Sequence, residues 1–404
     1  MNSDTETTSS NDFSVSLLPP TVKKLGAVSF FADIASEMLY PITPIFLTTI
    51  LGTSMSSLGL IEGCAEAIAS LLKTFSGAWS DKISQRKPFV VAGYFLGAIS
   101  KPFIGLSTNW LHVLMARGLD RTGKGFRSAP RDALIAESVS DQHKGAALGW
   151  HRGMDTLGAA MGPLLTISLI SYFQFELRQL YWWALIPGLI SVFIAMTVKE
   201  KLNKATSLKK SKKMVWSLDG FDPNFKKYLV AWTIFSVVNS SDVFLLMRAQ
   251  KSGFSTTAIV LLYCAYNLVY ALSSPYLGKM SDKVPRKYLM VLGLAIYSVV
   301  YLGFGLASSA WHFWILFLTY GLYMGATDGV GKALALDYCP KELKATGLGI
   351  LGTVTGISTI IASVSAGYIW DHLGMSFTFY VASFGALISM AVFMTLKNKT
   401  QTVS

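Results

Sequence analysis

GAWSDKISQRKP, at residues 77–88, returns about 200 residues later as GKMSDKVPRKY, at residues 278–288. Each copy joins Ser-Asp-Lys to a following Arg-Lys, and each lies between two long apolar runs. A polar stretch that is duplicated in this setting indicates a loop between two helices in each of two related halves.

Two further stretches return in the same order and at nearly the same offset. DRTGKGFRSAPRD (120–132) has a weaker counterpart in DGVGKALALDY (328–338), and KGAALG (144–149) matches KATGLG (344–349). Internal repeats of this kind are typical of secondary transporters, which are built from two related bundles.

The composition predicts a membrane protein. Of 404 residues, 52% are hydrophobic and 14% are charged, whereas a soluble domain usually carries about 25% charged residues. Apolar runs of about 20 residues, long enough to cross a bilayer as helices, recur from Leu25 to Leu396. We therefore predict an all-α membrane protein with twelve transmembrane helices in two pseudo-symmetric six-helix bundles.

The predicted spans are 25–50, 56–79, 88–107, 110–136, 145–172, 179–198, 227–249, 257–279, 287–307, 311–337, 345–370 and 375–396. The predicted domains are a disordered tail (1–22), an N-terminal bundle (23–198), a linker (199–226), a C-terminal bundle (227–397) and a second tail (398–404). Residues 1–22 lack the basic and apolar regions of a signal peptide.

Lysine and arginine gather in the loops on one side of the predicted membrane, and only Arg178, Arg248 and Lys251 lie on the other side. Because basic loops stay in the cytoplasm, both tails are expected to be cytoplasmic and the protein to lie in the cytoplasmic (inner) membrane. The same bias explains the net charge of +12, so we expect no nucleic acid as a partner. We expect the lipid bilayer as a partner and a monomer as the working unit.

The duplicated loop resembles the signature of the major facilitator superfamily (MFS), and the resemblance covers all twelve spans. It implies a fold in which two bundles rock around a central cavity. Ser84 and Pro285 stand where that family usually has glycine. In span 5, Gly158 and Gly162-Pro163 resemble the glycine-proline motif of antiporters in the superfamily. The run RTGKGFRSAPRDALIAE resembles a mostly bacterial and archaeal branch whose substrate is unassigned.

By this resemblance, the two loops form a cytoplasmic gate. Asp81 is expected to cap a helix of the other half and to pair with Arg86, and Asp282 and Arg286 are the matching set. The expected gate residues are Gly77, Asp81, Arg86, Gly278, Asp282 and Arg286.

Charged residues inside the predicted spans mark the functional site, because an ionisable group in lipid is costly and is rarely kept without a role. Span 1 carries Asp33 and Glu37 one turn apart, before Pro41 and Pro44, which are expected to bend the helix. Span 2 carries Glu62 and Glu66 on one face, and span 4 supplies the opposite charge. Its charged residues are Arg117, Asp120, Arg121, Lys124, Arg127 and Arg131.

We predict that Arg117, Arg121 and Lys124 lie within salt-bridge or water-bridged reach of Asp33, Glu37 or Glu62. These acidic groups are then counter-ions, exchange partners for a substrate or proton, or both. Further candidates for coupling or for the cavity are Asp155 in span 5, Asp242 in span 7, and Asp328 and Lys332 in span 10. Tyrosines of the C-terminal half either shape the substrate site or serve packing.

The sequence has no nucleotide-binding loop, metal cluster or nucleophile triad, so we expect no enzyme activity, cofactor or metal. The predicted function is secondary active transport of a small solute by alternating access, coupled to protons and favouring efflux by antiport. Alternatives are a proton-coupled importer of a metabolite or a metal chelate such as a siderophore, and a lipid flippase or non-transporting sensor on the same fold.

Overall fold

The computed structural model describes residues 18–83, 85–140, 143–200, 218, 220–340 and 343–397. Most of the predicted tail 1–22, most of the linker 199–226 and the tail 398–404 lie outside the described residues.

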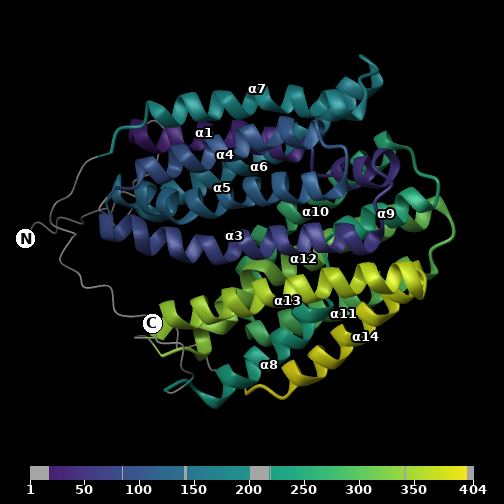
Figure 1. The fold of residues 1–404 in the computed structure, drawn as a ribbon. Helices are drawn as coiled ribbons and strands as arrows, with labels where there is room; N and C mark the ends of the chain where they lie inside the picture. The colour runs from purple at the N-terminus through teal and green to yellow at the C-terminus, as the bar shows by residue number, and fades with distance from the viewer. Residues whose placement is uncertain are drawn as a thin grey trace, which may run out of the picture.

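The described chain is built of helices that follow the predicted spans closely (Figure 1). The elements are α1 (Pro20–Glu37), α2 (Thr43–Ile45), the π-helix η2 (Phe46–Ile50), α3 (Met55–Ile83), α4 (Lys87–Gly105), α5 (Trp110–Glu137), α6 (Lys144–Ser171), α7 (Leu177–Met196), α8 (Pro223–Val238), α9 (Val243–Lys251), α10 (Thr256–Lys283), α11 (Arg286–Leu306), α12 (Ala310–Tyr338), α13 (Lys344–His372) and α14 (Met375–Met394).

Spans 1 and 7 are interrupted helices. In span 1, α1 ends at Glu37 and α2 begins at Thr43, as expected from Pro41 and Pro44, because proline lacks the N–H that continues a helix. The interruption of span 7, at residues 239–242, was not predicted from the sequence. Its residues are Asn-Ser-Ser-Asp, whose short polar side chains compete with the backbone for hydrogen bonds and so favour caps and turns over helix interiors.

The helices form two bundles that meet along two helix pairs. Helices α1 and α3–α7 pack on one another, as do α8–α14, while α3 packs on α13 and α6 on α10 across the interface. Figure 1 shows α7, α1 and α4 at the top, α8 and α14 at the bottom, and α3 next to α13 between them. The all-α, two-bundle prediction is confirmed.

Contacts between α3 and α13 are concentrated toward one end. We call the end of the molecule where α1 begins and α14 ends the basic end, and the opposite end the far end. Toward the far end the two helices touch at glycines: a Cβ on Gly63 would lie 2.9 Å from Ile360 Cα. The last such contact toward the basic end joins Gly356 to Ser70, and a Cβ on Gly352 would meet nothing within 4 Å. Small residues allow this close approach.

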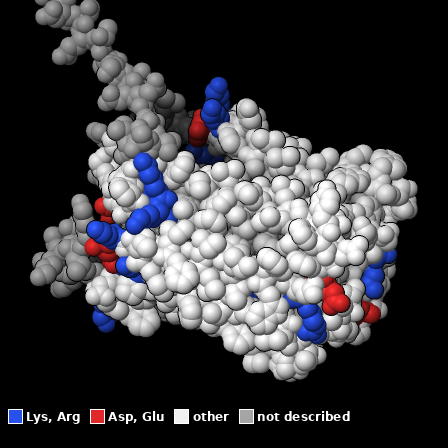
Figure 2. All heavy atoms as spheres, turned by 90° about the horizontal axis from the view of Figure 1, so that it is seen from above, with Lys and Arg blue, Asp and Glu red and all other residues white. Residues whose placement is uncertain are grey.

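The surface agrees with a chain that spans a membrane. By length and apolar composition alone, nine of the described helices are able to cross a bilayer. Helix α5 is not among them, because charged residues interrupt it. Figure 2 shows charged side chains gathered toward the two ends and a broad uncharged band between them. The protein is therefore an integral membrane protein whose charged helix is sheltered inside the bundle.

Candidate functional site

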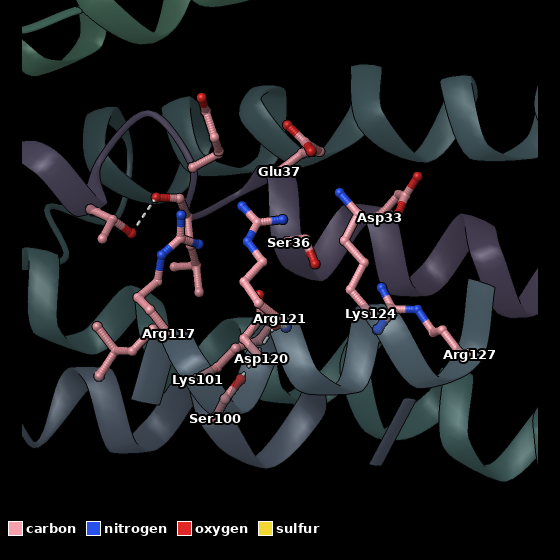
Figure 3. Close-up of a pocket in the computed structure, with 14 residues that line it drawn as sticks. Asp33, Ser36, Glu37, Ser100, Lys101, Arg117, Asp120, Arg121, Lys124 and Arg127 are labelled. Atoms are coloured by element: carbon pink, nitrogen blue, oxygen red, sulfur yellow. Dashed lines mark hydrogen bonds and ion pairs between the residues drawn. The ribbon is translucent and has the colours of Figure 1, made fainter. Parts of the chain in front are cut away.

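A polar cavity lies inside the N-terminal bundle, between α1, α4 and α5 (Figure 3). The cavity volume is about 60 Å³, which is enough for a few waters or a small charged group. It is lined by Asp33, Ser36, Glu37, Leu39, Tyr40, Thr43, Ser100, Lys101, Ile104, Arg117, Asp120, Arg121, Lys124 and Arg127.

One of the predicted ion pairs, Arg117 with Glu62, is present beside the cavity. Both Nε and Nη2 of Arg117 donate to Glu62 Oε1, at 3.1 and 2.6 Å, and Nη2 also donates to Oε2 at 2.7 Å. Both side chains are buried. Such a fork-to-carboxylate pair is strong and directional, so the predicted contact of Arg117 with Glu62 is present and the pair fixes α5 against α3.

Asp120 is bound by a residue that the sequence analysis missed. Lys101 of α4 approaches Asp120 Oδ1 at 3.7 Å and donates to Gly97 O at 2.6 Å. Ser100 Oγ lies 3.4 Å from the same carboxylate oxygen. Lys101 is the one charged residue within the apolar run of span 3, and that isolation was a signal that could have identified it.

Arg121 and Lys124 have no direct counter-ion. Neither forms an ion pair within 4 Å with a described residue, and Arg121 Nε is buried without a hydrogen-bond partner. Both feel the field of Glu66 and of the predicted partner Glu37, and a second predicted partner acts on each of them, Glu62 on Arg121 and Asp33 on Lys124. In the described site, these two residues therefore form no direct salt bridge with Asp33, Glu37 or Glu62, and the water-bridged contact stays a prediction. Figure 3 shows both side chains extending from α5 toward the helix that carries Asp33 and Glu37.

The acidic residues of α1 have other partners. The Asp33 carboxyl is in side-chain contact with Asp155 of α6. Arg152 lies 3.6 Å from Asp155 on its other side. Glu37 accepts a short hydrogen bond from the hydroxyl of Tyr263, which belongs to α10 in the other half. One residue of the cavity thus contacts the C-terminal bundle directly.

Arg127 and Arg131 bind groups of their own bundle. Arg127 donates to Gly93 O at 3.4 Å, and its guanidinium lies 4.5 Å from the ring centroid of Tyr94. Arg131 pairs with Asp132 at 2.9 Å, and its Nη1 also lies within hydrogen-bonding distance of Ser29 and Tyr94. The buried His151 binds Ser29 as well, at 2.6 Å. These contacts join α5 to α4, α1 and α6.

In the C-terminal half, tyrosine hydroxyls bind the acidic residues that were predicted for the site. Asp242, at the break between α8 and α9, accepts hydrogen bonds from Tyr320 at 2.6 Å and Tyr266 at 3.1 Å. Asp328 is bound by Lys332 at 2.8 Å and by Tyr270 at 2.9 Å. Tyr266, Tyr320 and Tyr323 are buried in the core, so packing is the interpretation that the structure favours for these three.

The two predicted gate loops contain matching ion pairs at the basic end. Asp81 pairs with Arg86 at 2.8 Å, and Arg86 also binds Glu137 at 2.6 Å. Although burial opposes it, the carboxylates of Glu137 and Asp81 raise the pKa of Arg86 above its ordinary value. Glu200 accepts from the backbone N–H groups of Arg86 and Lys87 and so caps the first turn of α4.

In the other half, Arg286 pairs with Asp282 at 3.2 Å and with Asp337 at 2.7 Å. Glu137 and Asp337 were not predicted, although they stand 200 residues apart in matching positions of the repeat. The Asp81 and Asp282 side chains are 62% and 70% exposed, and their described hydrogen bonds stay within their own half. Gly77 lies against Ala129 of its own half, and Gly278 has open space beside it. Among the residues that the structure describes, Asp81 does not form the expected cap on the other half in this conformation.

A cap of the expected kind occurs instead at the far end, and it joins the two halves. Asp371, near the end of α13, accepts from the backbone N–H groups of Met55 at 3.2 Å and Ser56 at 2.8 Å. It also accepts from the Ser56 hydroxyl at 2.6 Å. A carboxylate is stabilised at a helix N-terminus, so Asp371 fastens α13 to the start of α3.

Comparison with known proteins agrees with the two-bundle architecture. The family model described as Major Facilitator Superfamily matches residues 25–263 and 228–403. A Methanocaldococcus jannaschii protein named as an uncharacterized MFS-type transporter is 34% identical over 92% of this chain and 94% of its own length. Multidrug resistance protein 2 of Bacillus subtilis is 23% identical over 92% of this chain and 93% of its own length.

Among solved structures, a mutant form of the nucleoside transporter NupG superposes with a TM-score of 0.79. The match covers 93% of this chain and 99% of the other, at 12% sequence identity, so it bears on the fold alone. Because the family model spans nearly all of the described helices and the archaeal relative matches over almost the entire chain, this protein belongs to the major facilitator superfamily of transporters.

Proposed function

We propose that this transporter couples movement of a small solute to protons and exports that solute across the cytoplasmic membrane. The observation that carries the proposal is the contact between Asp33 of α1 and Asp155 of α6 at the edge of the cavity. Two carboxyl groups in contact cannot both be ionised at low cost. A pair that shares a proton in one conformation releases it when the two helices change their distance or their access to water.

The placement of basic residues supports the orientation. Helix ends at the basic end carry Lys24, Arg86, Lys144, Arg286 and Lys397, among others. Basic loops remain in the cytoplasm, so the basic end and both termini are placed there in the proposal. All the residues that line the cavity come from the N-terminal half, and we propose that one monomer carries out the whole cycle.

Cross-half contacts support alternating access. At the far end, Asp371 binds α3 and Tyr263 binds Glu37, while α3 and α13 are apart toward the basic end. Lys124 and Glu66 are exposed although protein surrounds them, as expected for side chains in a water-filled cavity. On the other side of the interface, Arg152 of α6 still reaches Tyr270 of α10. These contacts correspond to a conformation that faces the cytoplasm.

The packing of α6 on α1 supports export. A Cβ on Gly162 would lie 2.8 Å from Ile34 O, and a Cβ on Gly158 would lie closer still to Phe30 O. These are the glycines of the motif that resembles antiporters. A relative that matches over most of the chain is named a multidrug resistance protein, which is consistent with outward transport.

The test begins with metabolite profiling of cells with and without the protein, which identifies the solute. That solute is then loaded into proteoliposomes, and its flux is measured with a pH gradient imposed and then collapsed. Proton coupling predicts that flux follows the gradient in the wild type and loses this dependence in Asp33→Asn and Asp155→Asn.

Asp132→Asn is the matched control, because Asp132 lies next to Arg131 on α5 and does not line the cavity. It should keep the gradient dependence. Flux that ignores gradient collapse in the wild type would refute proton coupling. Accumulation of the solute in cells that express the protein would favour import instead of export.

A further inference from the structure

Arg121 and Lys124 are two neighbouring cations in the cavity. Neither has an ion-pair partner among the described residues. They are three residues apart on α5, so they project from the same face one turn apart. Arg121 is 8% exposed and its Nε has no partner among the described residues. A buried guanidinium N–H without an acceptor costs free energy, and two adjacent like charges add to that cost.

The neighbouring helices do not supply the missing acceptor. On α3, Glu62 is bound by Arg117. Lys101 of α4 binds Asp120 of α5. The other acid of α3 near the two cations is Glu66. It is exposed and forms no ion pair within 4 Å with a described residue.

The acids of α1 are bound elsewhere as well. Asp33 contacts Asp155, and Glu37 accepts from Tyr263. Glu66 is thus the one nearby acid in the described site without a bonded partner, and it faces two cations. In the described site, two cations without a bonded partner therefore stand against one acid without a bonded partner.

We infer that Arg121 and Lys124 bind the anionic group of the transported solute, which makes the substrate a small organic anion. The group is a carboxylate, phosphate, phosphonate or sulfonate. A guanidinium binds two oxygens of such a group at once, and an ammonium donates to a third or binds it as a point charge. This inference rests on the proposed transport function and adds the substrate class to it.

The cavity size fits this assignment. Room of about 60 Å³ for water centres admits a charged headgroup but not a large body. The rest of the solute extends along the space where α3 and α13 are apart, toward the basic end. Lys124 is exposed, so a solute arriving from that end meets its charge before it meets the buried Arg121.

Binding is tested on the full-length protein in a neutral detergent, by calorimetric titration and by thermal unfolding. The probes are phenylphosphonate, benzoate and inorganic phosphate, with benzamide as the neutral and benzylamine as the cationic comparison. The expected result is that the anions bind and raise the unfolding temperature, phenylphosphonate more than phosphate, while benzamide and benzylamine do not. Equal binding of benzamide, or no binding of any anion, would overturn the inference.

Lys124→Gln provides the sharpest variant, because its side chain is exposed and its loss leaves the buried pairs intact. It should weaken phenylphosphonate binding by about tenfold or more, the loss expected when a charge-assisted contact is removed. Arg121→Gln should weaken it further, and Arg121→Lys should restore part of it. Lys251→Gln, at the end of α9, removes the same charge away from the cavity and should bind as the wild type does. Equal affinity of Lys124→Gln and wild type would refute the assignment.

The two proposals fail separately. Anion binding that depends on Lys124, without any gradient-driven flux in proteoliposomes, would keep the binding site and remove the transport mechanism. Gradient-driven flux of a neutral or cationic solute, with no anion binding, would keep proton coupling and remove the substrate class.

Discussion

The two halves share one fold, but the lysine of the Gly-Lys sequence that each half repeats has a different setting in each. In α5, Lys124 has no ion pair within 4 Å among the described residues, and it lines the cavity. In α12, Lys332 of the repeated Gly-Lys sequence lies eight residues further along its helix than Lys124 does in α5. It binds Asp328 at 2.8 Å, one turn away, and Asp328 also accepts from Tyr270. The N-terminal half therefore keeps a cation available, while the C-terminal half satisfies its own charge locally.

The same contrast holds for the buried acids. Glu62 and Asp120 are matched by arginine and lysine, whereas Asp242 receives two tyrosine hydroxyls. Neutral donors hold a carboxylate without adding a second charge, so the C-terminal half forms a hydrogen-bonded, aromatic core. The comparison teaches that the buried acids of the described site are held by cations in the N-terminal bundle and by tyrosine hydroxyls in the C-terminal one, and in the proposed cycle the ion chemistry belongs to the first.

The largest expected effect is that of Glu62→Gln. It leaves the Arg117 guanidinium buried and uncompensated, a loss that typically costs about 3–5 kcal/mol. The measurement is thermal unfolding in detergent together with proteoliposome flux, and both should fall sharply. The double variant Glu62→Gln with Arg117→Met removes both charges and should recover much of the stability. If the single variant is as stable as the wild type, ion pairing does not hold the N-terminal half together.

Asp242→Asn should have a smaller effect. The amide keeps a carbonyl oxygen for one tyrosine but directs an NH₂ group at the other, so one buried hydroxyl loses its acceptor, at a cost of about 1–3 kcal/mol. Stability should fall while the pH dependence of flux is unchanged, because the proposed cycle places the ion chemistry in the N-terminal half. A shifted pH profile would show instead that Asp242 takes part in coupling and that the contrast between the halves is wrong.

Asp371→Ala tests the fastening between the halves. Loss of a cap at a helix N-terminus is worth about 0.5–2 kcal/mol, and here that loss should favour opening at the far end. Ser363 is fully buried against Gly59, so Ser363→Cys reports opening by its rate of thiol labelling. The three native cysteines, Cys64, Cys264 and Cys339, are free and must first be replaced by serine.

Labelling should speed up several-fold in Asp371→Ala, because an equilibrium constant changes tenfold for each 1.4 kcal/mol. Asp371→Asn is the matched control, since its side-chain oxygen still accepts from a helix N-terminus. Unchanged labelling in the alanine variant would mean that the fastening does not govern the far end.

Much of the fold was predictable because apolar runs and their repeat carry it. The predicted spans agree with the helices to within a few residues at most ends. The bend of span 1 followed from Pro41 and Pro44. The break in span 7 also had a signal, the four consecutive polar residues from Asn239 to Asp242, but their effect on a helix depends on whether neighbouring groups satisfy the freed backbone.

The contacts of the site were predictable only where opposite charges on adjacent spans determine which residues pair. The bond of Arg117 to Glu62 followed from opposite charges on adjacent spans. The bond of Asp120 to Lys101 depends on how α4 is rotated against α5, which periodicity does not fix. The cap of Asp371 on α3 joins residues more than 300 positions apart and requires knowledge of which helices meet at the far end.

The smallest expected effect is that of Lys332→Gln. This variant is the most direct test of the contrast between Lys124, which lacks an ion pair in the described site, and Lys332, which has one. An exposed pair four residues apart on a helix contributes about 0.3–0.5 kcal/mol, so thermal unfolding should hardly change. Flux should fall far less than in Lys124→Gln, because Asp328 keeps its bond from Tyr270 and no cavity cation is lost. Both variants remove one lysine charge, so comparing their fluxes under one pH gradient shows the effect of where that charge lies. Equal losses in both would mean that the transported solute meets the two halves alike, and that the difference in pairing reflects one conformation of a symmetric cycle.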